Sequence, residues 1–213
     1  AISLVLVMCL SSLAVLAPSA SAAGEDAPLG SSGGGRGYVC ITFDDGYKGV
    51  YDYALPVLSS YGIPATAYVI TDMIGESGRM DASELLALQS AGWEIGSHGK
   101  SHSTMTNIDM TEAEEEMAGS KQALEALGLD VRTFAYPGGE YNDELVALGA
   151  KYYERQRTTL LGVPTHSLGL NLYLSEYPSA IKIVGARAPG YLSTAAEDLD
   201  RAIQSDTVLI WYF

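Results

Sequence analysis

Cysteine is almost absent from this sequence of 213 residues, which contains only Cys9 and Cys40. Cys9 lies in an apolar N-terminal stretch that has the pattern of a cleaved export signal, so the mature chain would keep a single thiol. A single thiol cannot form an intramolecular disulfide, and this excludes a small domain held together by disulfides. The fold must instead be stabilised by a hydrophobic core or by a bound metal.

Basic residues are also scarce, since Lys and Arg number 12 against 26 Asp and Glu and the formal net charge is −14. Nucleic-acid-binding domains normally carry a basic patch, and the few cations here are scattered along the chain. We therefore expect neither nucleic acid nor an anionic membrane surface as a partner. The sequence also lacks any repeat of about 20–50 residues and any three-residue glycine period, which excludes solenoid and collagen-like folds.

The N-terminal segment predicts export. Residues 2–17 are apolar apart from three serines, and a small-x-small cleavage site at 20–22 precedes the acidic Glu25 and Asp26. We expect residues 1–22 to be a signal peptide whose basic start is missing, and the mature protein to be secreted or held at the cell surface without a stable membrane span. An uncleaved anchor is the alternative, although the apolar stretch is short for a bilayer core of about 30 Å.

A Gly/Ser-rich linker is predicted over residues 23–37 and a single α/β domain over residues 38–213. In the second range β-rich runs alternate with segments of helical period, and the 47% apolar content of the chain is enough for a sizeable core. The expected strands span 38–43, 65–70, 93–96, 131–135, 152–158, 181–184 and 207–213. The expected helices span 51–61, 82–91, 111–127, 142–151 and 194–204. This alternation favours a distorted (β/α) barrel of about seven parallel strands over an open sheet, and chemistry in such barrels collects where the strands end.

Two of the expected strands end in motifs that could be either functional or simple turns. Asp44 and Asp45 follow the first strand, and their carboxylates can share a site only if the strand breaks there, as Gly46 allows. Asp-Gly is also a common turn signal, so this motif alone leaves both interpretations open. The Pro-Gly-Gly turn at 137–139 exposes backbone N–H groups that could donate to a developing oxyanion, and an ordinary turn is again the alternative.

Histidine is rare, yet two of the three residues, His98 and His102, lie four positions apart just after another expected strand. One helical turn would place both imidazoles on the same face. Neutral imidazole is the commonest ligand of transition metals, whereas an isolated histidine is more often an ordinary surface or core residue. The pair therefore predicts a metal site.

Taken together, the three motifs resemble those of the polysaccharide deacetylase family, also called the NodB-homology domain or carbohydrate esterase family 4. The family motifs read T-F-D-D-G, H-(S/T)-x-x-H and a turn ending in Pro-x-Gly. Residues 42–46, 98–102 and 137–139 follow this pattern in the same order. The resemblance implies a NodB-like barrel over 38–213.

The resemblance also implies a role for each motif. One divalent metal, most often Zn²⁺ with Co²⁺ or Ni²⁺ as alternatives, would be bound by Asp45, His98 and His102. The general base that removes a proton from the attacking water would be Asp44. Groups that hold the oxyanion and the substrate would come from Tyr136, Pro137 and Gly138.

The sequence departs from the family pattern at three places. Ala135 stands where the family often has an arginine that orients the catalytic carboxylates, and the possible replacements are Arg132, Arg155, Arg157 and Arg187. Gly99 stands where Ser or Thr is usual, and Ser101 could supply the missing hydroxyl. The family's general acid is a histidine after the last apolar strand, but the sequence ends at Phe213. We expect the chain to be cut just short of this acid, so that it keeps the metal site but deacetylates poorly.

The predicted function is metal-dependent hydrolysis of acetyl groups on an extracellular or cell-wall polysaccharide, with N-acetyl favoured over O-acetyl groups. Two alternatives remain open at this point. One is a carbohydrate-binding or scaffolding protein that keeps the barrel without turnover, and the other is a hydrolase of small non-sugar amides. The sequence gives no prediction of the oligomeric state.

Overall fold

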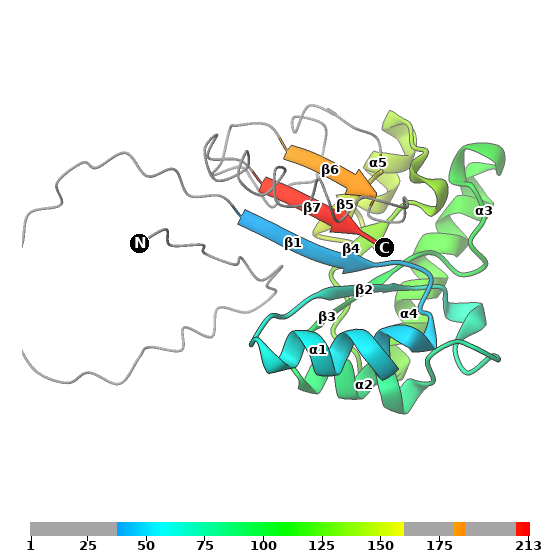
Figure 1. The fold of residues 1–213 in the computed structure, drawn as a ribbon. Helices are drawn as coiled ribbons and strands as arrows, with labels where there is room; N and C mark the ends of the chain where they lie inside the picture. Colours follow the sequence, from blue (N-terminus) through cyan, green and yellow to red (C-terminus); the bar gives the residue numbers. More distant parts are fainter. Residues whose placement is uncertain (1–37, 160–180, 186–207) are drawn as a thin grey trace, which may run out of the picture.

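The computed structural model describes residues 38–159, 181–185 and 208–213 (Figure 1). These residues form one sheet of seven strands in the order β5-β4-β3-β2-β1-β7-β6, and every pairing between neighbours is parallel. The sheet curls into part of a barrel with helices on its outer side, as Figure 1 shows. The expected α/β barrel architecture is therefore confirmed.

The strands are short and close to the expected ranges. They are β1 (Tyr38–Phe43), β2 (Thr66–Val69), β3 (Glu94–Ser97), β4 (Thr133–Ala135), β5 (Arg155–Arg157), β6 (Ile181–Gly185) and β7 (Val208–Tyr212). The α-helices are α1 (Leu55–Ser60), α2 (Ala82–Ser90), α3 (Met110–Glu114), α4 (Ser120–Ala126) and α5 (Asp143–Gly149). Short 3-10 turns are η2 (Thr71–Met73), η3 (Met105–Asn107) and η5 (Pro137–Gly139), and π-helical turns are η1 (Val50–Ala54) and η4 (Glu115–Gly119). The predicted signal peptide, linker and helix over 194–204 lie outside the described residues.

Side-chain caps begin three of the helices, α2, α3 and α5. The spacing of Asp81 and Glu84 predicts a capping box at the start of α2, and the structure has it: each side chain accepts a hydrogen bond from the other residue's backbone N–H. The spacing of Thr111 and Glu114 predicts a second capping box, and this prediction is wrong. Asp109 caps α3 instead, because its carboxylate accepts hydrogen bonds from the N–H groups of Thr111 (2.8 Å) and Glu112 (2.9 Å).

The hydrophobic core lies between the sheet and the helices that cover it. Its fully buried members include Ile95, Phe134, Leu85, Leu88, Met117 and Leu124, from β3, β4, α2, η4 and α4. The strands run parallel, so their carboxyl ends meet at one edge, where the chain end after β7 lies beside the end of β1 (Figure 1). No helix within the described ranges combines the length and the apolar composition that a membrane crossing requires.

Close packing in the sheet predicts a sensitive position at Gly96 of β3. A Cβ atom there would lie 2.5 Å from the ring of Tyr68 and 2.7 Å from Oγ1 of Thr133, both of which are buried. We expect Gly96→Ala to lower the free energy of unfolding by about 1–3 kcal/mol, as overpacking of a core does. Gly49→Ala is the matched control, because its Cβ would meet only a side-chain carbon of Tyr53 at 3.7 Å. Urea denaturation of both variants tests this, and equal stability of the two would contradict it.

Candidate metal centre

Asp44 and Asp45 leave the end of β1 at the point where the strand breaks. Asp45 and Gly46 both have a φ angle of 68°, in the left-handed region that only glycine adopts freely. Arg79 donates a hydrogen bond to the carbonyl oxygen of Asp45, which helps to hold this turn. The two adjacent carboxylates consequently line the same pocket, as the break at Gly46 predicts.

His98 and His102 also lie close together, but not on a helical turn. The segment between them is irregular, with φ angles of 79° at Gly99 and 68° at His102. The expectation that one turn of helix joins the two rings is therefore wrong, because left-handed residues cannot continue a right-handed helix. The loop instead brings the ring centroids to 4.9 Å in an edge-to-face arrangement.

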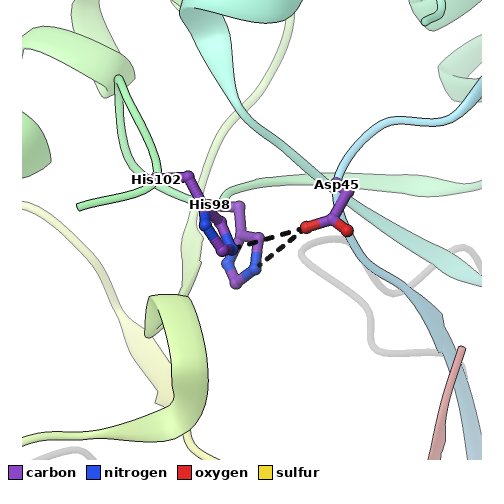
Figure 2. Close-up of side chains that lie close together, drawn as sticks. All are labelled: Asp45, His98 and His102. Carbon is purple, nitrogen blue, oxygen red and sulfur yellow. Dashed lines mark ion pairs between the residues drawn. The ribbon is translucent and has the colours of Figure 1, made fainter. Parts of the chain in front are cut away.

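Asp45, His98 and His102 point toward one another from two different strand ends (Figure 2). Oδ1 of Asp45 lies 3.6 Å from Nε2 of His98 and 3.5 Å from Nε2 of His102. One ligand atom of each side chain lies within 4.8 Å of the others, so a single ion could touch all three. One carboxylate and two imidazoles form a donor set that suits zinc and leaves positions open for water and substrate.

The orientation and charge of His98 suit a metal ligand. Its Nδ1 donates a hydrogen bond to the carbonyl oxygen of Ala135 at 2.7 Å, which directs Nε2 toward Asp45. Burial lowers the pKa of His98 below its ordinary value, and the nearby guanidinium of Arg157 adds to the effect, while Asp44 opposes it. The ring is therefore neutral at pH 7, which is the form that binds a metal.

Asp44 forms a buried ion pair with Arg157 of β5. Nη2 of Arg157 donates a hydrogen bond to Oδ1 of Asp44, and the guanidinium also lies 4.8 Å from the ring centroid of Tyr68. Burial opposes the charge on Arg157, but Asp44 and Tyr68 outweigh it and the pKa of Arg157 lies above its ordinary value. A permanent buried cation beside Asp44 favours the ionised carboxylate.

The register of the sheet explains why Arg157 fills this place. Ala135 of β4 stands where the family often has an arginine, and it pairs directly with Arg157 of β5. Arg157 therefore occupies the neighbouring position on the next strand. Arg132 instead bonds to Asp130, and Arg155 lies 3.8 Å from Glu154. Arg187, the fourth candidate, lies outside the described residues, and so does His166, the third histidine of the sequence, which matches no family motif.

The buried ion pair predicts that substitutions of Asp44 and Arg157 do not have additive effects on the free energy of unfolding. We expect Arg157→Met to lower the free energy of unfolding by about 3–5 kcal/mol, because it removes the charge that balances the carboxylate of Asp44. The same change in an Asp44→Asn background should cost at least about 1 kcal/mol less. Arg132→Met is the control, since Arg132 pairs with the exposed Asp130. This change should lower the free energy of unfolding by no more than about 1 kcal/mol. Equal costs of Arg157→Met in both backgrounds, measured in urea, would contradict the coupling.

The turn at 136–138 forms one wall of the site. A pocket of about 230 Å³ is lined by Asp44, Asp45, His98, His102, Tyr136, Gly138 and Thr159. Gly138 is exposed with a φ angle of 68°, whereas Pro137 is buried and lies outside this lining. The hydroxyl of Tyr136 donates to Gln156, and burial raises the pKa of Tyr136. Tyr136 therefore shapes the wall rather than offering its hydroxyl to the pocket.

The carboxyl end of β7 reaches the same edge of the sheet. The backbone N–H of Asp44 donates to the carbonyl oxygen of Phe213 at 3.0 Å, and Phe213 N–H donates to Thr42 at 3.0 Å. These two hydrogen bonds place Phe213 directly beside Asp44.

Comparison with known proteins shows what the chain is similar to. The sequence is 32% identical over 134 residues to the Bacillus subtilis protein YxkH, covering 62% of this chain and 48% of that protein. It is 28% identical over 133 residues to the poly-beta-1,6-N-acetyl-D-glucosamine N-deacetylase of Staphylococcus aureus, covering 54% of this chain and 46% of the enzyme. The chain thus spans about half the length of these curated relatives.

A solved structure shows a similar fold. The Streptococcus pyogenes deacetylase PplD, determined in complex with acetate, superposes with a TM-score of 0.58 at 28% identity, covering 62% of this chain and 61% of PplD. The sequence profile described as polysaccharide deacetylase matches residues 32–154, which is more than half of the chain and includes all three motifs. With these motifs placed around one pocket of a NodB-like barrel, the chain belongs to the polysaccharide deacetylase family.

Proposed function

We propose that this protein hydrolyses acetyl groups, chiefly N-acetyl groups, on an extracellular or cell-wall polysaccharide with the help of one divalent metal. The observation that carries the proposal is the convergence of Asp45, His98 and His102 beside Asp44 in one pocket. The Staphylococcus aureus relative acts on poly-N-acetylglucosamine according to its name, which supports an N-acetylated glycan as substrate. The predicted signal peptide supports an extracellular location.

The donor set fits Zn²⁺, with Co²⁺ and Ni²⁺ as alternatives, and the residues that would hold the ion are Asp45, His98 and His102. The carbonyl of Ala135 supports this fit, because it fixes the ring of His98 with Nε2 toward the other two ligands. When bound, the ion would serve as a Lewis acid that lowers the pKa of water and polarises the acetyl carbonyl.

The remaining residues of the pocket would handle the proton and the substrate. Asp44 would accept the proton of the attacking water on its carboxylate, which Arg157 keeps ionised and oriented. The backbone N–H of Gly138 would donate to the oxyanion that forms at the acetyl carbonyl. Tyr136 and Pro137 would hold the turn that carries this donor. The amine that leaves must be protonated, and the resemblance implies that a histidine after β7 would supply this proton.

Acetate release tests the proposal. The full-length protein, loaded with Zn²⁺, is incubated with poly-β-1,6-N-acetylglucosamine, chitin oligosaccharides, peptidoglycan, acetylated xylan and small acetamides. We expect acetate from an N-acetylated glycan, loss of activity with a chelator and recovery when Zn²⁺ is restored. Glycan binding without acetate release would favour a binding protein instead. Release from small amides alone would favour the non-sugar hydrolase.

A further inference from the structure

The loop between the two histidines is held by backbone and side-chain groups from two other parts of the fold. On one side, the N–H groups of Thr71 and Asp72 donate to the carbonyl oxygens of Gly99 (3.2 Å) and Lys100 (2.9 Å). The N–H groups of Lys100 and Ser101 lie on the opposite side of the loop. The loop therefore needs an acceptor on its second side.

Glu116 of η4 supplies that acceptor. Its Oε2 accepts hydrogen bonds from the backbone N–H groups of Lys100 at 2.7 Å and Ser101 at 2.9 Å, and its Oε1 accepts one from the Ser101 hydroxyl. Glu116 is only 8% exposed, although it belongs to a strongly acidic segment. One buried carboxylate thus engages three donors from two consecutive residues of the loop.

The same carboxylate packs tightly against the backbone at Gly99. A Cβ atom on Gly99 would lie 3.0 Å from Oε2 of Glu116, and the φ angle of 79° at this residue already disfavours a side chain. The Ser or Thr that the family motif usually carries here would therefore meet Glu116. In this chain, a hydroxyl at position 99 is replaced on this side of the loop by Glu116 and Ser101, while the Oγ of Ser97 accepts the Gly99 N–H at 3.1 Å.

We propose that Glu116 is a positioning residue that holds the loop 99–101 in the conformation that directs His102 toward Asp45 and His98. The proposal rests on the metal site proposed above. His102 needs such support because its φ angle of 68° is unfavourable for a residue with a side chain, and because its side chain is 42% exposed. Outer-shell groups of this kind commonly change metal affinity by about 10–100-fold.

Cobalt binding to the purified chain tests the proposal, using chelator competition for affinity and the visible absorption bands of Co²⁺ for ligand geometry. We expect Glu116→Ala to weaken binding about 10–100-fold and to alter the absorption bands. Glu116→Gln should stay within about threefold of the parent, because its amide oxygen can accept both N–H groups and its NH₂ can donate to Ser101. Glu115→Ala is the matched control: Glu115 contacts the same loop only through the Lys100 side chain, at 2.8 Å.

Hydrogen exchange of the metal-free protein gives a second readout that does not depend on the ion. The amides of Lys100 and Ser101 should exchange faster in Glu116→Ala than in the parent or in Glu115→Ala. If Glu116→Ala does not fold, Glu116→Asp replaces it, since the shorter side chain withdraws the carboxylate while keeping its charge. A folded Glu116→Ala or Glu116→Asp protein with parental Co²⁺ affinity and parental protection of both amides would overturn the proposal. A parent chain that binds no Co²⁺ would instead refute the metal site, and the exchange data would still decide the role of Glu116.

Discussion

Replacing Asp45 with alanine should abolish metal uptake. Asp45 is the only carboxylate of the three grouped ligands, and its Oδ1 lies within 3.6 Å of both imidazole Nε2 atoms. Because loss of an outer-shell partner already weakens metal binding by about 10–100-fold, loss of this direct ligand should weaken it by at least about 100-fold. Chelator competition with Zn²⁺ or Co²⁺ measures the change.

Two further variants distinguish loss of the carboxylate ligand from a disturbed backbone at position 45. Asp45 has a positive φ angle, which alanine tolerates poorly and asparagine tolerates well. Asp45→Asn should therefore fold normally and still lose most of its metal affinity, since it removes the anionic ligand. Asp52→Ala removes one exposed negative charge from η1 and should bind metal like the parent. An Asp45→Ala protein that retained a full equivalent of metal would show that the ion binds elsewhere.

Asp44→Asn, unlike Asp45→Ala, should still bind the metal but should lose turnover. The amide oxygen of asparagine can still accept the hydrogen bond from Arg157, so the pocket should keep its shape. The amide cannot take up a proton at neutral pH, and we expect kcat to fall by about 10²–10⁴-fold, the usual contribution of a general base. Acetate release and metal content of the full-length protein are measured on the same sample.

The metal content distinguishes a lost base from a lost ligand. Asp44 lines the pocket but is not one of the three grouped ligand residues. Metal affinity of Asp44→Asn should therefore remain within about threefold of the parent, well below the effect of losing an outer-shell partner. If Asp44→Asn kept parental activity, the assignment of Asp44 as the base would be wrong. If it lost the metal, Asp44 would belong to the ligand set.

Much of the candidate site can be predicted from the sequence, because its residues directly follow strands that the sequence also predicts. The break at Gly46 is visible in the sequence, and it predicts that neighbouring carboxylates can share a pocket. The proximity of His98 and His102 is predicted correctly but for the wrong reason, since a loop with left-handed residues joins them instead of a helix. Spacing alone does not distinguish these two backbones.

Other parts of the site depend on contacts between distant segments. Arg157 is one of four candidate arginines, and only the pairing of Ala135 with Arg157 across two strands selects it. Glu116 cannot be distinguished in the sequence from the neighbouring glutamates, which are Glu112, Glu114 and Glu115. The helix that carries them turns only Glu116 into the loop amides. No local pattern carries that information.

The most direct test of the metal site is anomalous X-ray scattering at the zinc edge from crystals grown with Zn²⁺. The account predicts one strong peak per chain, about 2.0–2.2 Å from a carboxylate oxygen of Asp45 and from Nε2 of both His98 and His102. Zinc bound at another place, or crystals soaked with Zn²⁺ that show no peak between these three side chains, would contradict it.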